Sequence, residues 1–289
     1  MKRYEFIQEQ ADEHPVKALC EVMRIRRSSY YAWRQSKSRE RAMSDEMIKR
    51  MIEPVFRESR QTYGARRLTA CLKKVGINTS RRRVCRLMKA GGMVPRQVAR
   101  WHKQTTQADE CHEKAPNLLD QDFSAERPNQ KWVVDITYIA TKEGWLYLAV
   151  LLDLYSRAVV GWSMQNRMTT GLVMEAWKMA CAWRHPPEEI LHHSDMGSQY
   201  TSKAYLALLR EQNCQISMSG KGNCYDNACV ESFFSTLKAE CADRVFESRL
   251  EARNHIFEYI EVWYNRKRLH STLGYLSPLE FEIRGACVQ

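Results

Sequence analysis

The stretch KWVVDITYIATKEGWLYLAVLLDLYSRAVVGWSM, residues 131–164, decides the fold, because it holds three apolar segments separated by short turns. Val, Ile, Leu, Tyr and Trp dominate the segments 131–140, 145–155 and 157–164, and this composition is typical of β-strands. The turn DLYSR joins two of the segments as a hairpin, so we predict a meander in a mixed or antiparallel sheet. Asp135 is the exception in this stretch, because an acid interrupts a strand that otherwise has a buried pattern.

The residues after this stretch alternate between helix and strand patterns. Helices are predicted at 169–184, at 202–213 and from Asn227, with short strands at 189–194 and 215–219 between them. Such an order describes an α/β sheet covered by helices. A last helix is predicted at 251–270, and its basic end is expected to be exposed as a candidate DNA contact: Arg266, Lys267, Arg268 and His270.

Positive charge is concentrated in the first third of the chain. The whole chain has 45 Lys and Arg against 34 Asp and Glu, and residues 1–105 hold 26 of the former and 10 of the latter. The first part therefore carries +16 and the remainder −5. This split suggests a polyanion-binding module ahead of a second domain, although charge alone leaves a merely solvated basic surface open.

Two helical hairpins occupy the basic third. Residues 15–34 predict a helix, a turn through Met23 to Ile25, and a second helix that begins at Ser28 or Ser29. Further helices are predicted at 44–59, 63–76 and 79–92. Recognition helices place their N-terminal residues in the major groove. The predicted DNA contacts are therefore the basic residues at two helix starts: Arg26, Arg27, Arg81, Arg82, Arg83 and Arg86.

Composition excludes several other classes of protein. The N-terminal residues have no apolar signal segment, and the longest apolar run is broken by Asp153, so we expect a soluble, untargeted protein without a membrane span. The 10 cysteines show no C-x-x-C pair, which favours reduced thiols over disulfides. Cys111-His112 and His192-His193 lack the spacing of a zinc site.

Three acids in the second part of the chain occupy unusual positions. Asp135 interrupts a strand, Asp195 follows a predicted strand end, and Glu231 lies beside the apolar stripe of its helix. A helix cap or a local ion pair explains each acid taken singly. Taken together, three carboxylates without thiols or imidazoles at metal-ligand spacing nearby suggest a site for Mg²⁺ or Mn²⁺.

The strings around these acids resemble a known family. Asp195 and Glu231 are separated by 35 residues, and Lys238 follows the glutamate by seven, which is similar to the D, D-35-E signature of retroviral integrases and bacterial insertion-sequence transposases. PNQKWVVDITYI, HSDMGSQY, KGNCYDNACVESFFSTLKAE and YIEVWYNRKRLHSTLGYLSPLEFE resemble the second-reading-frame transposase of the insertion-sequence-three group. YGARRLTACLKK resembles the N-terminal helix-turn-helix region of the same group, so the resemblance covers nearly the whole chain.

The resemblance implies a fold and a domain order. The fold is an RNase-H-like α/β core with a mixed five-stranded sheet flanked by helices, preceded by a small all-α helix-turn-helix region. Asp135 is expected on the first strand, Asp195 after the fourth, and Glu231 on a following helix. We place the domains at 1–43 (helix-turn-helix-like segment), 44–105 (basic helix-turn-helix DNA-binding domain), 106–126 (linker) and 127–289 (integrase-like catalytic core with the C-terminal helix).

The resemblance also implies an activity. The triad Asp135, Asp195 and Glu231 would hold two Mg²⁺ or Mn²⁺ ions, cleave DNA at element ends and join the freed 3′-OH to another phosphodiester by direct transesterification. Lys238 would contact DNA near the cut. The expected partners are terminal inverted repeats, target DNA, further copies of the chain on DNA and an upstream-frame product, at the bacterial nucleoid in the cytoplasm. Two alternatives stay open: a non-catalytic repressor derived from a transposase, and a nuclease of the same fold.

Overall fold

The computed structural model describes residues 2–96, 115–220 and 227–287. The chain divides into two compact units, Met1–Pro95 and Arg96–Gln289. Each unit has its own buried core. In the described ranges, no helix combines the length and the apolar character that are needed to cross a bilayer.

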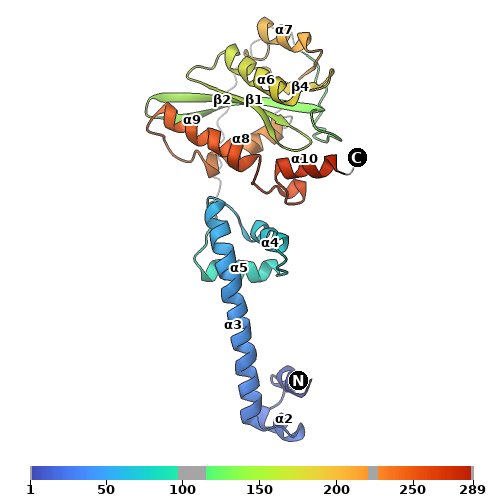
Figure 1. The fold of residues 1–289 in the computed structure, drawn as a ribbon, viewed down its shortest axis with the longest axis vertical. Coiled ribbons are helices and arrows are strands. Elements are labelled where there is room, and N and C mark those ends of the chain that lie inside the picture. Colours follow the sequence, from blue (N-terminus) through green and yellow to red (C-terminus); the bar gives the residue numbers. More distant parts are fainter. Residues whose placement is uncertain (1, 97–114, 221–226, 288–289) are drawn as a thin grey trace. The chain divides into compact units, whose positions relative to one another are not determined.

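The first unit is helical (Figure 1). Its helices are α1 (Lys2–Gln10), α2 (Val16–Val22), α3 (Arg27–Glu58), α4 (Ala65–Lys74) and α5 (Arg81–Ala90). A small core forms where α1 and α2 pack on the start of α3, with Ile7, Leu19, Cys20 and Tyr30 buried. At the other end of α3, Ile48, Ile52 and Phe56 are buried, as are Leu68 of α4 and Val84 of α5.

The sequence predicted one helix up to residue 34 and another from residue 44, and helix α3 shows that the break between them is wrong. Helix α3 is a single helix of 32 residues that runs through residue 43, where a domain boundary was placed. The sequence between Gln35 and Met43 contains no Gly or Pro and is rich in Arg, Lys, Glu and Ala, so nothing in it ends a helix. The short helical motifs at the two ends of α3 therefore share one continuous element.

The second unit is built on a five-stranded sheet. Its strands are β1 (Lys131–Thr141), β2 (Gly144–Asp153), β3 (Val159–Gln165), β4 (Leu191–Ser194) and β5 (Gln215–Met218). The strand order is β3-β2-β1-β4-β5, with β1, β2 and β3 antiparallel and β1, β4 and β5 parallel. This arrangement confirms the predicted mixed sheet, and it makes β1 the strand at which the antiparallel and parallel parts meet.

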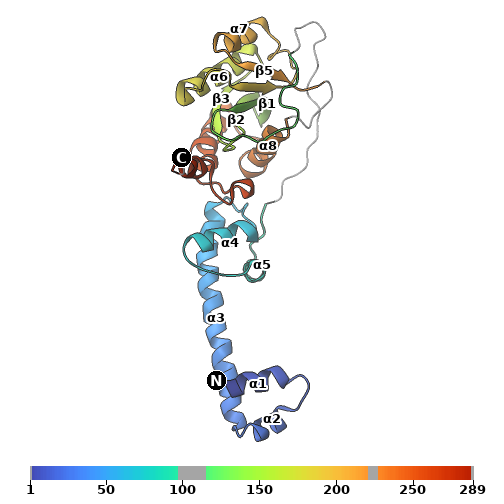
Figure 2. The same ribbon diagram turned by 90° about the vertical axis from the view of Figure 1, so that its right-hand side faces the viewer.

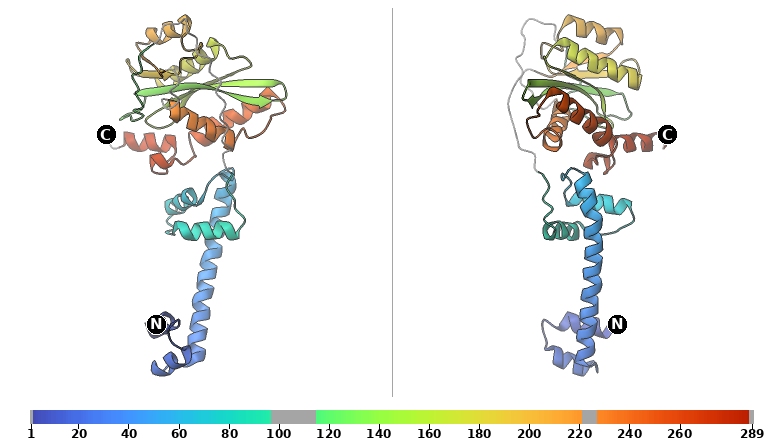
Figure 3. Two further views of the ribbon diagram at one scale, coloured as in Figure 1. Left: turned by 180° about the vertical axis from the view of Figure 1, so that it is seen from behind. Right: turned by 60° about the vertical axis from the view of Figure 1, so that its left-hand side comes forward.

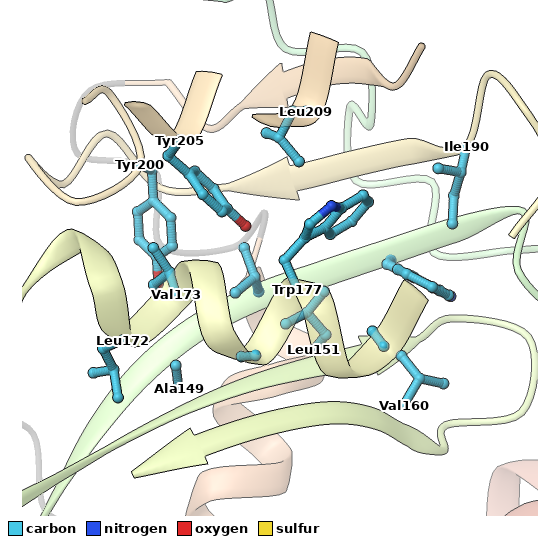
Figure 4. Packing of buried hydrophobic residues seen from close by; sticks show 14 of the residues in the cluster. Ala149, Leu151, Val160, Leu172, Val173, Trp177, Ile190, Tyr200, Tyr205 and Leu209 are labelled. Carbon is cyan, nitrogen blue, oxygen red and sulfur yellow. The ribbon is translucent and has the colours of Figure 1, made fainter. Parts of the chain in front are cut away.

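Helices cover both faces of the sheet (Figures 1 and 2). One face carries α6 (Thr170–Arg184) and α7 (Lys203–Glu211), and the other carries α8 (Ala228–Glu240) and α9 (Arg249–Glu258). Figure 4 shows Trp177 of α6 within the buried cluster that also contains Leu151, Val160 and Leu209. Gly161 permits this close packing, because a Cβ on it would lie 2.7 Å from the Cβ of Ala180.

The C-terminal segment differs from the predicted helix at 251–270. Helix α9 ends at Glu258 and continues as a π-helix, η2 (Tyr259–Tyr264). A 3₁₀ turn, η3 (Ser271–Leu273), and a last helix, α10 (Pro278–Ala286), follow. Arg268 is not part of an exposed basic end, because it is 6% exposed and its guanidinium binds the carboxylate of Glu240 on α8 at 2.8–3.0 Å.

Candidate active site

The hydrogen-bond register of β1 and β4 sets where the first two acids lie. Lys131 pairs with Leu191 and Val133 with His193, so each paired residue of β4 follows its β1 partner by one constant interval in the sequence. Asp135 and Asp195 are separated by the same interval, so they stand at the same level, just beyond the last pair. Neighbouring strands lie about 4.8 Å apart, and alternate residues share a face. The ladder therefore brings the two acids close to one another at the same end of the β1–β4 pairing.

Asp135 is half-buried on β1, opposite Val150 of β2. Burial and the charge of the Asp195 carboxylate, in that order, raise the pKa of Asp135 to about 8, and the charge of Glu231 adds to the effect. The Ile136 backbone N–H, which donates to Asp135 Oδ1 at 2.7 Å, and the charge of Lys238 act in the opposite direction. The electrostatic environment of Asp135 thus contains both other acids and the lysine.

Asp195 lies directly after β4, in a tight turn that suits its carboxylate. The Gly197 backbone N–H donates to Asp195 Oδ1 at 2.9 Å. A Cβ at position 197 would lie 3.0 Å from the same oxygen, so a side chain there would crowd the carboxylate. Glycine at 197 is what allows the backbone to approach the acid this closely.

Glu231 is exposed and lies in the first turn of α8, as predicted. The apolar stripe beside it is buried, with Val230 and Leu237 fully so and Phe233 in edge contact with Tyr264 at 4.7 Å between ring centroids. Asn227, the residue before the helix, makes no side-chain capping bond, and Asp226 lies outside the described residues. The packed stripe, rather than a cap, is what fixes the side of α8 that Glu231 occupies.

Lys238 is half-buried on α8, with its Nζ 4.8 Å from the centroid of the Tyr138 ring on β1. Burial lowers the pKa of Lys238, and the charge of Asp135 raises it. The Tyr138 ring packs edge-on against Trp145 of β2 at 4.8 Å. An edge-on pair of aromatic rings therefore supports a lysine ammonium whose charge acts on Asp135, and Tyr138 is a candidate site residue that the sequence reasoning missed.

Tyr200 is a second candidate site residue that the sequence reasoning did not single out. Its side chain is 2% exposed, and within the described part of the chain its hydroxyl makes no hydrogen bond. Burial, then the charges of Asp135 and Asp195, raise its pKa well above the usual value. By contrast, His193 is bound at Nδ1 to the Ser217 hydroxyl at 2.8 Å inside the sheet, which gives it a structural role.

The three carboxylates fit a divalent cation by their chemistry and by their mutual repulsion. Carboxylate oxygens are the ligands that Mg²⁺ prefers, and the pKa of Asp135 is raised first by burial and then by the negative charges of Asp195 and Glu231, which a cation would neutralise. Among the residues that the structure describes, however, no three acidic, His or Cys side chains converge closely enough to hold one ion together. The acids are electrostatic neighbours whose side chains would have to close on an ion.

The arginines predicted to bind DNA fall into two groups. Arg26, Arg27, Arg81 and Arg82 are exposed and pair with no acid among the residues that the structure describes, and Arg86 is also exposed although it pairs with one. Arg83 Nε and Arg86 Nη2 instead bind the two carboxylate oxygens of Asp45 on α3, at 2.6 and 2.7 Å. Because Asp45 already pairs with both of them, these two arginines fasten α5 to α3.

Comparison with known proteins places the chain in a class. Residues 125–224 and 212–278 match two integrase core domain families, and residues 43–101 match a helix-turn-helix-like domain family. The catalytic core of HTLV-2 integrase in complex with magnesium is 17% identical, with a TM-score of 0.41, over 55% of this chain and 99% of that chain. The chain is a protein with an integrase core and a helix-turn-helix-like DNA-binding domain.

Two similar proteins show the family to which the chain belongs. Transposase InsF for insertion sequence IS3A of Escherichia coli (strain K12) is 44% identical over 283 residues, 97% of this chain and 98% of the relative. An uncharacterized 31 kDa protein of insertion element IS600 from Shigella sonnei is 44% identical over 264 residues, 91% of this chain and 97% of the relative. The chain belongs to the IS3 family of insertion-sequence transposases.

Proposed function

We propose that the chain cleaves DNA strands at the ends of its insertion sequence and transfers them, with Asp135, Asp195 and Glu231 as the ligands of divalent metal ions. The observation that supports this most is the placement of Asp195 directly after β4, the parallel neighbour of the strand that carries Asp135, with the charges of Asp195 and Glu231 both acting on Asp135. A purely structural role would not favour acids of like charge at one level of a sheet.

Each residue has a distinct task in this proposal. Asp135 and Asp195, held by the strand ladder, and Glu231, held by the packed stripe of α8, present carboxylate oxygens to Mg²⁺ or Mn²⁺. Two such ions, when bound, activate the attacking water or 3′-OH and stabilise the leaving oxygen of the phosphodiester. Lys238 Nζ, supported by Tyr138, contacts a phosphate near the cut. Transfer is direct, so no Ser or Tyr becomes bonded to DNA.

The first unit supplies binding to the terminal inverted repeats in this proposal. Its exposed arginines lie at helix starts, where helix-turn-helix proteins contact the major groove. Joining of two element ends requires at least two copies of the chain on DNA. We include an upstream-frame product as a partner and action at the bacterial nucleoid, which are expectations from the family.

The test uses the full chain, Mg²⁺ and a labelled duplex taken from the end of the element that encodes it. Glu231→Gln should leave DNA affinity unchanged and lower cleavage and joining by on the order of 1,000-fold, because a ligand charge is lost at the reacting phosphate. Glu175→Gln is the matched control, since Glu175 is an exposed acid on α6, on the other face of the sheet.

Each outcome of this test decides between functions. Binding of the end duplex by the unaltered chain without cleavage would assign a repressor. Cleavage without joined products would assign a nuclease. If Glu231→Gln cleaves DNA at the rate of the unaltered chain, Glu231 is not a ligand of the metal ions.

A further inference from the structure

Helix α3 carries a helix-turn-helix arrangement at its beginning as well as near its end. Helix α2 is followed by a turn in which Arg24 has φ +55° and Ile25 N–H donates to the Cys20 carbonyl at 2.9 Å. Helix α3 then begins at Arg27, and Tyr30 is buried against α1 and α2. We call residues 2–35 the first module and residues 44–95 the second module.

The two modules occupy the same side of α3. An α-helix turns about 100° and rises about 1.5 Å per residue, so a step of about 18 residues makes five full turns. Tyr30 and Ile48, which are both buried on α3 in their respective modules, are separated by one such step. Arg27 and Asp45, which lie beside the two basic helix starts, are separated by the same step. In Figure 1 and, seen from behind, in the left view of Figure 3, α2 and α4 lie on one side of α3 in projection, and the right view of Figure 3 shows them offset around it.

The basic side chains are repeated with the same period. Arg26 and Arg27 are exposed at the start of α3. At the start of α5, Arg81 and Arg82 are exposed, and this helix start is held beside Asp45 by Arg83. Two exposed arginine pairs therefore lie on one side of a rod, about 27 Å apart along its axis.

We propose that the two modules bind one DNA duplex together, in successive major grooves on one face, with α3 as the spacer that sets their distance. Successive major grooves on one face of B-DNA are about 34–36 Å apart. The spacing along α3 accounts for about 27 Å of this, and long arginine side chains at both ends reach the rest. The inference rests on the proposed binding of element ends and adds a second reading site to it.

The first experiment maps the footprint of the full chain on an end duplex of about 40 base pairs, in EDTA so that the DNA stays intact. We expect two protected major-groove tracts about one helical turn apart. The double variant Arg26→Ala, Arg27→Ala should lose the outer tract, and Arg81→Ala, Arg82→Ala the inner one. Arg50→Ala, Arg57→Ala is the matched control, because these exposed arginines lie about 120–140° around α3 from Arg27 and pair with glutamates.

A second experiment changes the helical phase of the spacer. Two alanines inserted after Gln35 turn the first module by about 200° relative to the second, and should abolish the outer tract. Seven inserted alanines turn it by only about 20° and lengthen the spacing from about 27 to about 37 Å, which is still close to the groove repeat, so the outer tract should be kept at the same position. Circular dichroism should show unchanged or slightly increased helix content in both variants.

The outcomes separate this inference from the proposed function. A single tract for the unaltered chain, with the same affinity after Arg26→Ala, Arg27→Ala, would overturn the two-module inference and leave end binding intact. Equal footprints for the two insertions would also overturn it, because phase would not matter. Failure of the unaltered chain to bind the end duplex would overturn the proposed function as well.

Discussion

At the scale of single residues, the most informative group is Asp135. An acid whose pKa is higher in the folded protein than in the unfolded chain favours folding while it is protonated, and that contribution is lost as the pH rises. The unfolded value is about 3.9, and the pKa of folded Asp135 is about 8 without metal. The folded state therefore loses stability between these two values when no cation is present.

The first prediction follows from this shift. In EDTA, the melting temperature of the protein should fall as the pH rises from about 4 to about 8. Asp135→Asn should flatten this dependence and melt higher than the unaltered protein at pH of about 8. Differential scanning fluorimetry measures both. Asp120→Asn, at an exposed acid in a turn, should follow the unaltered protein, and a parallel curve for Asp135→Asn would contradict the assignment.

The second prediction concerns the ring that supports Lys238. Tyr138→Leu removes the cation–π contact, which is worth about 1 kcal/mol, so the KM for DNA in strand cleavage should rise about fivefold while kcat changes little. Tyr138→Phe keeps a ring and should behave like the unaltered protein. Tyr147→Leu, at the residue opposite Tyr138 on β2, is the control and should affect stability alone. Equal KM values for Tyr138→Leu and Tyr138→Phe would show that the ring does not position the lysine.

At the scale of elements, helix α8 is anchored at the end away from Glu231. The Glu240 carboxylate accepts from Arg268, from the Tyr259 hydroxyl at 3.0 Å and from Trp263 Nε1 at 3.3 Å. Glu240 and Arg268 are 6% exposed, so each charge is removed from water and depends on the other. This network joins α8 to the π-helix η2 and to the residues after it.

The third prediction tests this anchor. Glu240→Gln leaves the Arg268 charge buried without its partner, and should lower the free energy of unfolding by about 3 kcal/mol or more. The double variant Glu240→Leu, Arg268→Met removes both charges and should recover most of that loss. Urea unfolding measures both. Glu247→Gln, which breaks an exposed pair with Lys142, should cost less than about 1 kcal/mol, and a similar small cost for Glu240→Gln would contradict the anchor.

Elements with strong local patterns could be predicted from the sequence, and tertiary pairings could not. The five strands were predicted within a few residues, because their apolar runs are bounded by turns. The break in α3 was wrong, because residues 35–43 lack an apolar period although nothing in them ends a helix. Arg268 was read as exposed, since its partner Glu240 lies on another helix, far from it in the sequence.

In the candidate site, too, contacts between elements could not be predicted from the sequence. Asp135, Asp195 and Glu231 were singled out from local pattern and from resemblance, and their roles stay a prediction. The stack of Lys238 on Tyr138 depends on how α8 packs on β1, which no local pattern reports. The split among the arginines depends on Asp45, a contact between α3 and α5 that the sequence does not reveal.

At the scale of the whole molecule, the two units differ in their charge. The first carries the excess of positive charge, and the second holds acids that would repel DNA without cations. Binding by phosphate contacts releases counterions, so the affinity should fall steeply with salt.

The fourth prediction uses this dependence. Each lost arginine–phosphate contact lowers the slope of log K against log salt by about 0.9. Arg81→Ala, Arg82→Ala should therefore reduce the slope by about 2 at unchanged thermal stability. Arg83→Ala should instead lower the melting temperature, because it breaks the pair with Asp45. Fluorescence anisotropy across a salt series measures the slope. An unchanged slope for the double variant would show that Arg81 and Arg82 do not contact DNA phosphates.

The parallel ladder between β1 and β4 also bears on how a chain could misfold. A slip by a single position in this ladder would turn every β4 side chain to the opposite face while leaving almost as many backbone hydrogen bonds. Such a trapped chain would be compact and sheet-rich, with Asp195 directed away from Asp135. The pKa of Asp135, which burial and then the Asp195 charge raise, would lose the contribution of Asp195 and be lower, so the titration of this one acid distinguishes correctly registered molecules from trapped ones in a refolded preparation.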